Sequence, residues 1–176
     1  MDMSIGAVGA AVVAGIVSIF GIIISKEQKV SEFRQAWIDE LRKCLIIYLV
    51  NINAICDAVR QIKAGGHSHA DLASSYKLLN EASHGIKLRI NQTEKPAKML
   101  LRSMEKFEIL AEKNENITPE NIRPLELEFL KHSRRLLKFE WKRVKKGEST
   151  FIWARRVVIA VTALLIAFLI YLGIYK

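Results

Sequence analysis

Cysteine is scarce in this chain: Cys44 and Cys56 are its only two. On one helix they would stand about 18 Å apart along the axis, which is too far for a disulfide. We therefore interpret both as reduced, small apolar side chains of a protein domain in the cytoplasm.

The residue patterns that carry common enzymatic chemistry are missing as well. The sequence has no glycine-rich phosphate loop and no nucleophile elbow. His67 and His69 form a His-x-His pair, but two ligands do not make a metal site, and neither His84 nor His132 adds a neighbouring ligand. We predict a non-enzymatic protein with no catalytic residue, no metal and no cofactor. An enzyme would instead require carboxylates or histidines that converge from distant positions.

Acids and bases are absent from two long apolar runs, Ile5–Ile24 and Val157–Tyr175. Each is close to the ~20 residues with which an α-helix crosses a bilayer. No positive charge precedes the first run, and it is longer than the apolar part of a signal peptide, so we interpret it as a retained anchor. The sequence predicts an all-α protein with transmembrane helices at 1–25 and 151–176 and a cytoplasmic helical domain at 26–150.

The charge that the ends lack is concentrated between them. The net charge is +9, and Lys176 is the only one of the 27 basic residues outside residues 26–156. Lysine and arginine near the ends of spans favour the cytoplasmic side. We expect residues 26–156 to be cytoplasmic, and both termini to lie outside as short tails.

Apolar residues in the middle recur in steps of three and four, the spacing of an amphipathic helix. This periodicity, with breaks at Gly65-Gly66, at Asn91–Pro96 and at Thr118-Pro119, predicts four helices. Their expected ranges are 26–63, 69–91, 96–113 and 119–146. Because the chain leaves and re-enters the membrane on one side, an even number of antiparallel helices closes the domain. We expect a four-helix bundle or an elongated, coiled-coil-like stack of hairpins.

Particular side chains are expected in the core of this bundle. We expect Phe33 and Trp37 to form a core pair four residues apart, and Trp141 to face inward from the last helix. The segment Cys44–Val50 is apolar on every face. We favour its burial inside the bundle over the alternative that part of it is a partner surface.

Small residues lie four apart on two neighbouring faces of the first run. They are Gly6, Ala10, Ala14 and Ser18 on one face, and Ala7, Ala11 and Gly15 on the other. In lipid, this spacing lets helix backbones approach closely. The partner is either the protein's own second span, where Ala163 and Ala167 offer a compatible row, or further copies of the chain in a homo-oligomer.

A basic cluster precedes the second run. It consists of Lys131, Arg134, Arg135, Lys138, Lys142, Arg143, Lys145 and Lys146. Such a juxtamembrane cluster is typical of proteins that bind anionic lipid headgroups. The alternative is that it only sets topology and forms a solvated helix face. We do not expect direct nucleic-acid binding, because no binding motif or set of stacking aromatics accompanies the charges.

Two segments resemble parts of known proteins. Ser31–Arg42 (SEFRQAWIDELR) resembles a segment of uncharacterised bacterial two-span inner-membrane proteins in which Phe-Arg-Gln-x-Trp-Ile opens a long helix. Ile86–Glu94 (IKLRINQTE) is similar to a second segment of that family, with Gln92 in place of its proline. The positions that carry the motif are Phe33, Arg34, Gln35, Trp37 and Arg42.

The resemblance implies the bacterial inner membrane as the location. By looser analogy, small two-span proteins with helical cytoplasmic parts act as membrane effectors in bacterial anti-phage systems, including retrons. This implies an effector that perturbs the bilayer under the control of its cytoplasmic domain, with a cytoplasmic protein or ribonucleoprotein as partner. The alternative is a constitutive membrane anchor or scaffold that docks a cytoplasmic partner.

Overall fold

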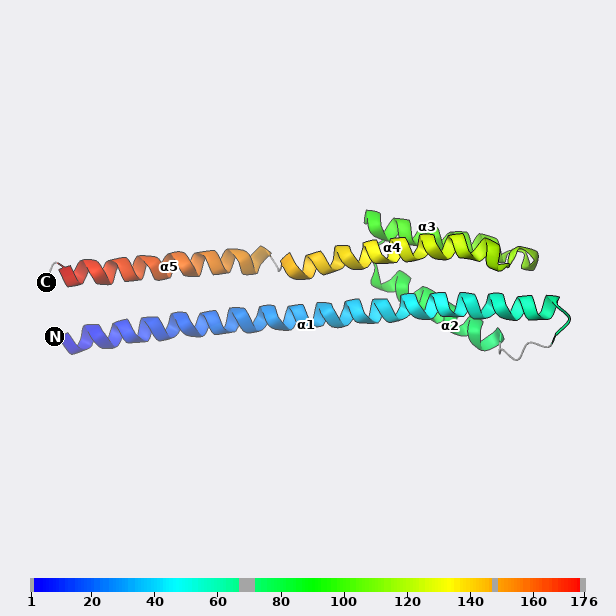
Figure 1. The fold of residues 1–176 in the computed structure, drawn as a ribbon. Helices are drawn as coiled ribbons and strands as arrows, with labels where there is room; N and C mark the ends of the chain where they lie inside the picture. Colours follow the sequence, from blue (N-terminus) through cyan, green and yellow to red (C-terminus); the bar gives the residue numbers. More distant parts are fainter. Residues whose placement is uncertain (1, 67–71, 147–148, 175–176) are drawn as a thin grey trace. The chain divides into compact units, whose positions relative to one another are not determined.

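The computed structural model describes residues 2–66, 72–146 and 149–174, and this part of the chain is all-α (Figure 1). The α-helices are α1 (Asp2–Lys63), α2 (Leu72–Arg89), α3 (Lys95–Ala111), α4 (Pro119–Lys146) and α5 (Ser149–Ile174), with a short 3₁₀ helix, η1 (Asn114–Asn116), before α4. No strand occurs within the described ranges. The prediction of an all-α protein is confirmed.

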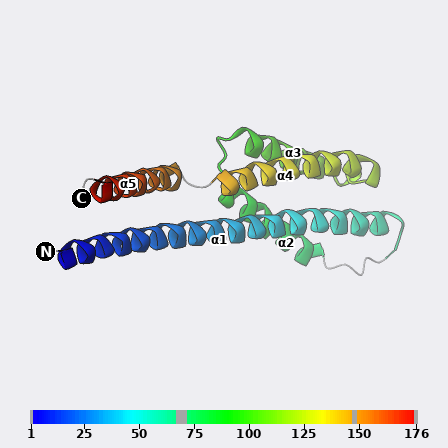
Figure 2. The same ribbon diagram turned by 60° about the vertical axis from the view of Figure 1, so that its left-hand side comes forward.

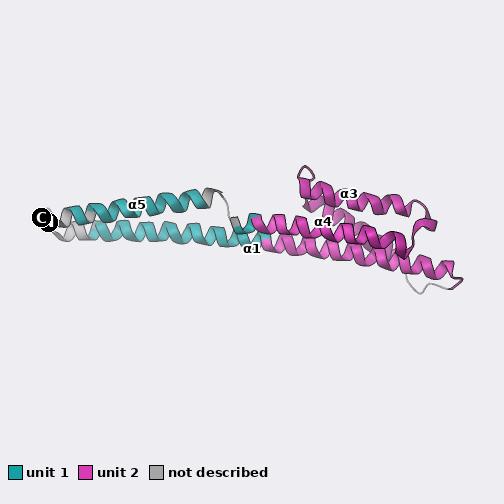
Figure 3. Ribbon diagram, turned by 45° about the horizontal axis from the view of Figure 1, so that its top comes forward, with its two compact units in different colours: residues 1–34, 143–176 teal, residues 35–142 magenta. Residues whose placement is uncertain are grey.

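The chain divides into two compact units (Figure 3). Residues 1–34 and 143–176 form one, here called the terminal unit, and residues 35–142 form the other, the central unit. Helix α1 passes from the first into the second without interruption. The apolar first run and the most densely buried segment of the chain are therefore parts of a single helix.

The central unit has one apolar core, to which four helices contribute. Helix α3 runs beside α4, and α2 crosses α1 (Figures 1 and 2). Side chains exposed by 1% or less and shared among these helices are Leu41, Ile86, Ala97, Leu100, Met104, Phe129 and Leu136. Apolar burial of this kind is the main favourable term in the stability of such a bundle.

Three aromatic rings hold α1, α3 and α4 together at the centre of this core. Tyr48 stacks on Phe129 with 5.1 Å between ring centroids and 23° between ring planes. Phe107 meets Phe129 edge to face at 6.2 Å and Tyr48 likewise at 6.2 Å. Such pairs add about 0.5–1.5 kcal/mol each beyond the burial of their area. The cluster links positions 81 residues apart in sequence.

Two helix ends match the signals in the sequence. Gly65 has a φ of 77°, and its neighbour Gly66 donates its backbone N–H to the Gln61 carbonyl at 3.1 Å. This is the left-handed glycine stop that satisfies the last carbonyls of a helix. At the start of α4, Thr118 Oγ1 accepts the backbone N–H of Asn121 at 3.3 Å, which confirms Thr118 as its N-cap.

Three expectations about the core were wrong. The Phe33 side chain is 75% exposed and Trp141 is 42% exposed, although Trp37 packs against the core as expected. Phe33 precedes the central unit, which begins at residue 35, so no core is available to it there. Within Cys44–Val50, Leu45 and Tyr48 are buried but Ile46 and Val50 are exposed by 55% and 58%. A helix apolar on all sides buries only the faces that its neighbours cover.

Gly85 marks the closest approach of α2 to α1. A β-carbon built at Gly85 would lie 2.8 Å from the Cys44 sulfur, well inside contact distance. Gly85→Ala is expected to lower the free energy of unfolding by about 1 kcal/mol, because an overpacking cost of about 1–3 kcal/mol outweighs a helix-propensity gain of about 1 kcal/mol. In a Cys44→Ala background the same change should instead stabilise. Denaturant unfolding of the four variants measures this, and an effect of the same sign in both backgrounds would contradict the proposed contact.

Candidate functional site

Most of the large apolar side chains described in the first half of α1 are exposed, whereas Ile16, Phe20 and Ile23 are partly covered. Those exposed by at least 42% are Val12, Val13, Val17, Ile19, Ile22 and Ile24. A core helix of a water-soluble domain hides one apolar face and turns polar residues outward. The opposite holds here, because this segment has an apolar surface and no polar face.

One helix in the described part of the chain, Gly9–Lys63, is long and apolar enough to cross a membrane. None of its most apolar window is buried inside the protein. Because exposed apolar surface is costly in water and neutral in lipid, this segment is suited to a bilayer. The first predicted span is supported in this sense.

The second predicted span does not meet the same standard. Residues 157–174 of this run lie on α5, whose apolar side chains are also exposed, with Leu164 at 70% and Phe168 at 57%. The described residues nevertheless contain one candidate span, Gly9–Lys63, and not the two that we expected.

The small residues of the first run lie on exposed faces of α1. Ala7, Ala10, Ala11, Ala14, Gly15 and Ser18 are all exposed, and the side-chain surroundings of Gly6 lie outside the described residues. A β-carbon at Gly15 would meet nothing within 4 Å. The partly covered positions are instead Gly9, Ile16, Phe20 and Ile23. On α5, Ala163 and Ala167 are exposed as well.

The Ser18 and Thr162 hydroxyls within the two apolar runs are satisfied inside their own helices. Ser18 donates to the Ala14 carbonyl at 2.9 Å, and Thr162 donates to the Val158 carbonyl at 2.9 Å. A hydroxyl bonded to the preceding turn needs neither water nor a partner chain. Both residues are therefore compatible with a hydrocarbon environment.

The basic cluster lies entirely on α4, just ahead of α5. Lys131, Arg134, Arg135, Lys138, Lys142, Arg143 and Lys145 are exposed, and the Lys146 side chain lies outside the described set. Their exposure leaves the cluster accessible to anionic headgroups, and equally to water.

The residues of the family motif have different surroundings. Gln35 is exposed, and Arg34 is partly buried. Arg42 forms an ion pair with Asp39 one turn earlier, and Lys43 pairs with Glu40 at 2.6 Å. Because these groups are largely exposed, the pairs add little to stability.

An apolar groove in the central unit escaped the sequence analysis. It has a volume of about 330 Å³ and lies between α1 and α4, with Ile46, Val50, Phe129 and Leu137 among its walls. The buried hydroxyl of Ser133 also lines it and has no hydrogen-bond partner among the described residues. The apolar outer face of Cys44–Val50 was the one signal that could have indicated it.

Metal-ligating residues do not gather in the described part of the chain. No group of three or more His, Cys, Asp or Glu residues is close enough to hold an ion there. His67 and His69 lie outside the described residues. His84 is exposed, whereas His132 is buried, with its Nε2 at 3.6 Å from Glu128 Oε1.

The sequence matches no protein-family model and no curated protein, and the fold matches no solved structure.

Proposed function

We propose that this chain is a non-enzymatic integral membrane protein whose cytoplasmic central unit controls a membrane-perturbing assembly of its spans. In this proposal α5 is a second span, both termini lie outside the cytoplasm, and the location is a bacterial inner membrane. The basic cluster binds anionic lipid beside the second span, and the spans associate as a homo-oligomer. Anti-phage defence, with a cytoplasmic protein or ribonucleoprotein as trigger, is the physiological setting that we propose.

One observation carries the proposal: α1 is a single uninterrupted helix with two different environments. Most of its described side chains from Ala7 to Ile24 are apolar and exposed, whereas Leu41, Tyr48 and Ile52 lie in the core of the central unit. A partner that repacks the central unit therefore acts on the same backbone that carries the candidate span. Hydrogen bonds from each turn to the next make such a helix a continuous connection.

The proposal is tested by inducible expression in a bacterial host with a potential-sensitive dye. Expression of the full chain, alone or during phage challenge, should collapse the membrane potential. The control is a chain with residues 35–142 intact but Ile5–Ile24 removed, which should leave the potential unchanged. Full retention of potential under both conditions with the intact chain would count against an effector.

The exposed small-residue rows offer a sharper prediction. Ala10→Leu with Ala14→Leu is expected to lower the yield of crosslinked oligomer roughly tenfold, as for a loss of about 1.4 kcal/mol. The reason is that leucine side chains keep the two helix backbones apart. Crosslinking in native membranes measures it. Val13→Leu with Val17→Leu is the matched control, because it adds bulk to exposed positions of the same run that are already large.

The groove between α1 and α4 favours a second candidate function, a constitutive anchor for a cytoplasmic partner. Exposed Ile46 and Val50 beside it form an apolar strip of the kind that partner helices cover. For an anchor, Val50→Asp should abolish a stable hetero-complex in mild detergent, and expression should leave membrane integrity unchanged. Loss of potential that persists in Val50→Asp would favour the effector.

A further inference from the structure

A second cavity in the central unit is lined by residues of α1, α2, α3 and α4. It has a volume of about 220 Å³ and is separate from the groove described above. Its walls are mostly aliphatic, among them Ile52, Leu79 and Ile117. An apolar cavity of about 150 Å³ already admits a benzene ring, so this cavity has room for a ligand with roughly nine non-hydrogen atoms.

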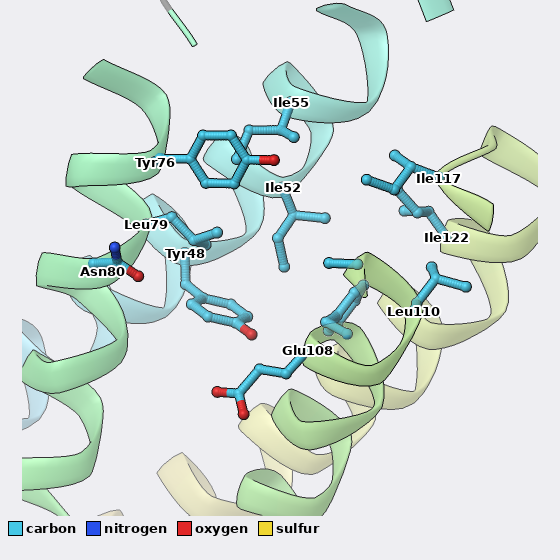
Figure 4. A pocket seen from close by; sticks show the side chains of 12 residues that line it. Tyr48, Ile52, Ile55, Tyr76, Leu79, Asn80, Glu108, Leu110, Ile117 and Ile122 are labelled. Atoms are coloured by element: carbon cyan, nitrogen blue, oxygen red, sulfur yellow. The ribbon is translucent and has the colours of Figure 1, made fainter. Parts of the chain in front are cut away.

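Four residues of the lining carry polar side-chain groups: Tyr48, Tyr76, Asn80 and Glu108. Figure 4 shows Asn80 and the Glu108 carboxylate toward one side, and Leu110, Ile117 and Ile122 toward the other. Glu108 is the only charged residue in the lining. This division into an apolar body and a polar end is typical of small-molecule sites.

Tyr48 is a further polar residue of the lining. It is 3% exposed, and its hydroxyl is not among the fully buried side-chain atoms that lack a hydrogen-bond partner. Burial, with the negative charge of Glu108 as a smaller cause, raises the pKa of Tyr48 well above its ordinary range, so the phenol stays neutral. A hydroxyl that lines a cavity can accept a hydrogen bond from a bound ligand or donate one to it.

The charge of the site decides which ligand it accepts. Glu108 Oε1 lies 3.2 Å from Lys87 Nζ, and Oε2 has no partner among the described residues. A carboxylate only accepts hydrogen bonds, so the complementary head group must donate them. An amine donates to Glu108 and to the Tyr48 oxygen together, whereas an anion is repelled by Glu108.

We propose that this cavity binds a small molecule with a compact apolar body and an amine head group. The body lies among Ile52, Leu79 and Ile117, and the amine bonds to Glu108 and Tyr48. The site does not depend on the membrane function proposed above, since all of its residues belong to the central unit.

The test uses the full chain in lipid nanodiscs, with benzylamine, benzyl alcohol and benzoate as probes and empty nanodiscs as the blank. Ligand-observed NMR titration should show saturable benzylamine binding above the blank, at least tenfold tighter than benzoate. Glu108→Gln should weaken benzylamine binding by about tenfold or more, the effect of losing a charge-assisted hydrogen bond. Glu105→Gln, an exposed change on the same helix outside the cavity, should leave it unaltered.

Leu79→Trp, which fills the cavity, should abolish binding of all three probes. If this variant fails to fold, the comparison of Glu108→Gln with Glu105→Gln still tests whether the amine binds at Glu108. Three results would each overturn the proposal: no saturable binding above empty nanodiscs, equal affinity for benzylamine and benzoate, or equal effects of the two glutamate variants.

Discussion

Phe129→Ala is expected to lower the free energy of unfolding of the central unit by about 3–5 kcal/mol, the usual cost of deleting a buried aromatic ring. Phe129 is 1% exposed and contacts both Tyr48 and Phe107. The change therefore removes two ring pairs and leaves a void where α1, α3 and α4 meet. Because a domain is stabilised by only about 5–15 kcal/mol in total, the loss should be visible as partial unfolding near growth temperature.

Denaturant titration of the full chain, followed by near-ultraviolet circular dichroism, measures this loss. Phe129→Leu keeps most of the volume and should cost less than about 1.5 kcal/mol. Phe33→Ala is the matched control, because that ring is 75% exposed and its removal should change stability by no more than about 0.5 kcal/mol. Equal costs at positions 33 and 129 would show that the described core is wrong.

Val13→Asp is expected to prevent the first span from entering the bilayer. A charge near the centre of a span costs about 2.5–3.5 kcal/mol on insertion scales, which corresponds to roughly a 100-fold change in the insertion equilibrium. The run has little hydrophobic free energy of insertion to offset this cost, because nine of the 20 residues from Ile5 to Ile24 are Gly, Ala or Ser. Val13 is 54% exposed, so the aspartate gains no shelter within the protein.

The readout is the accessibility of an N-terminal tag to a membrane-impermeant reagent on intact cells. In the proposed topology the wild-type tag reacts, and the Val13→Asp tag does not. Ser25→Asp is the control, since it adds the same charge at an exposed position directly after the run. A tag that is inaccessible in the wild type would contradict the orientation inferred from the basic residues.

Secondary structure was largely predictable, and the reason is visible at particular residues. Helix α1 ends just before Gly65-Gly66, and helix α4 begins at Thr118-Pro119. Both boundaries depend on local backbone chemistry, so the sequence alone is enough to place them. The run Cys44–Val50 was different. Its residues are apolar on every side, so periodicity could not tell that Leu45 is buried while Ile46 is exposed. Which face is covered depends on where α2, α3 and α4 pack.

The cavities could not be predicted from sequence for a related reason. Tyr48, Asn80 and Glu108 come from three helices, and nothing in the sequence near any of them indicates the other two. The close contact of Gly85 with Cys44 is another example. In the sequence, Gly85 indicates only a weak point in a helix, and its packing against the Cys44 side chain depends on tertiary structure.

The internal hydrogen bonds of Ser18 and Thr162 have a consequence for motion in the bilayer. Each hydroxyl is hydrogen-bonded within its own helix. Neither group therefore fixes the rotational orientation of its helix about the long axis in the hydrocarbon. Rotation of either segment about its long axis therefore breaks no hydrogen bond of these two side chains. In α1 the same rotation also turns Leu41 and Tyr48 in the core of the central unit, because they lie on the same uninterrupted helix.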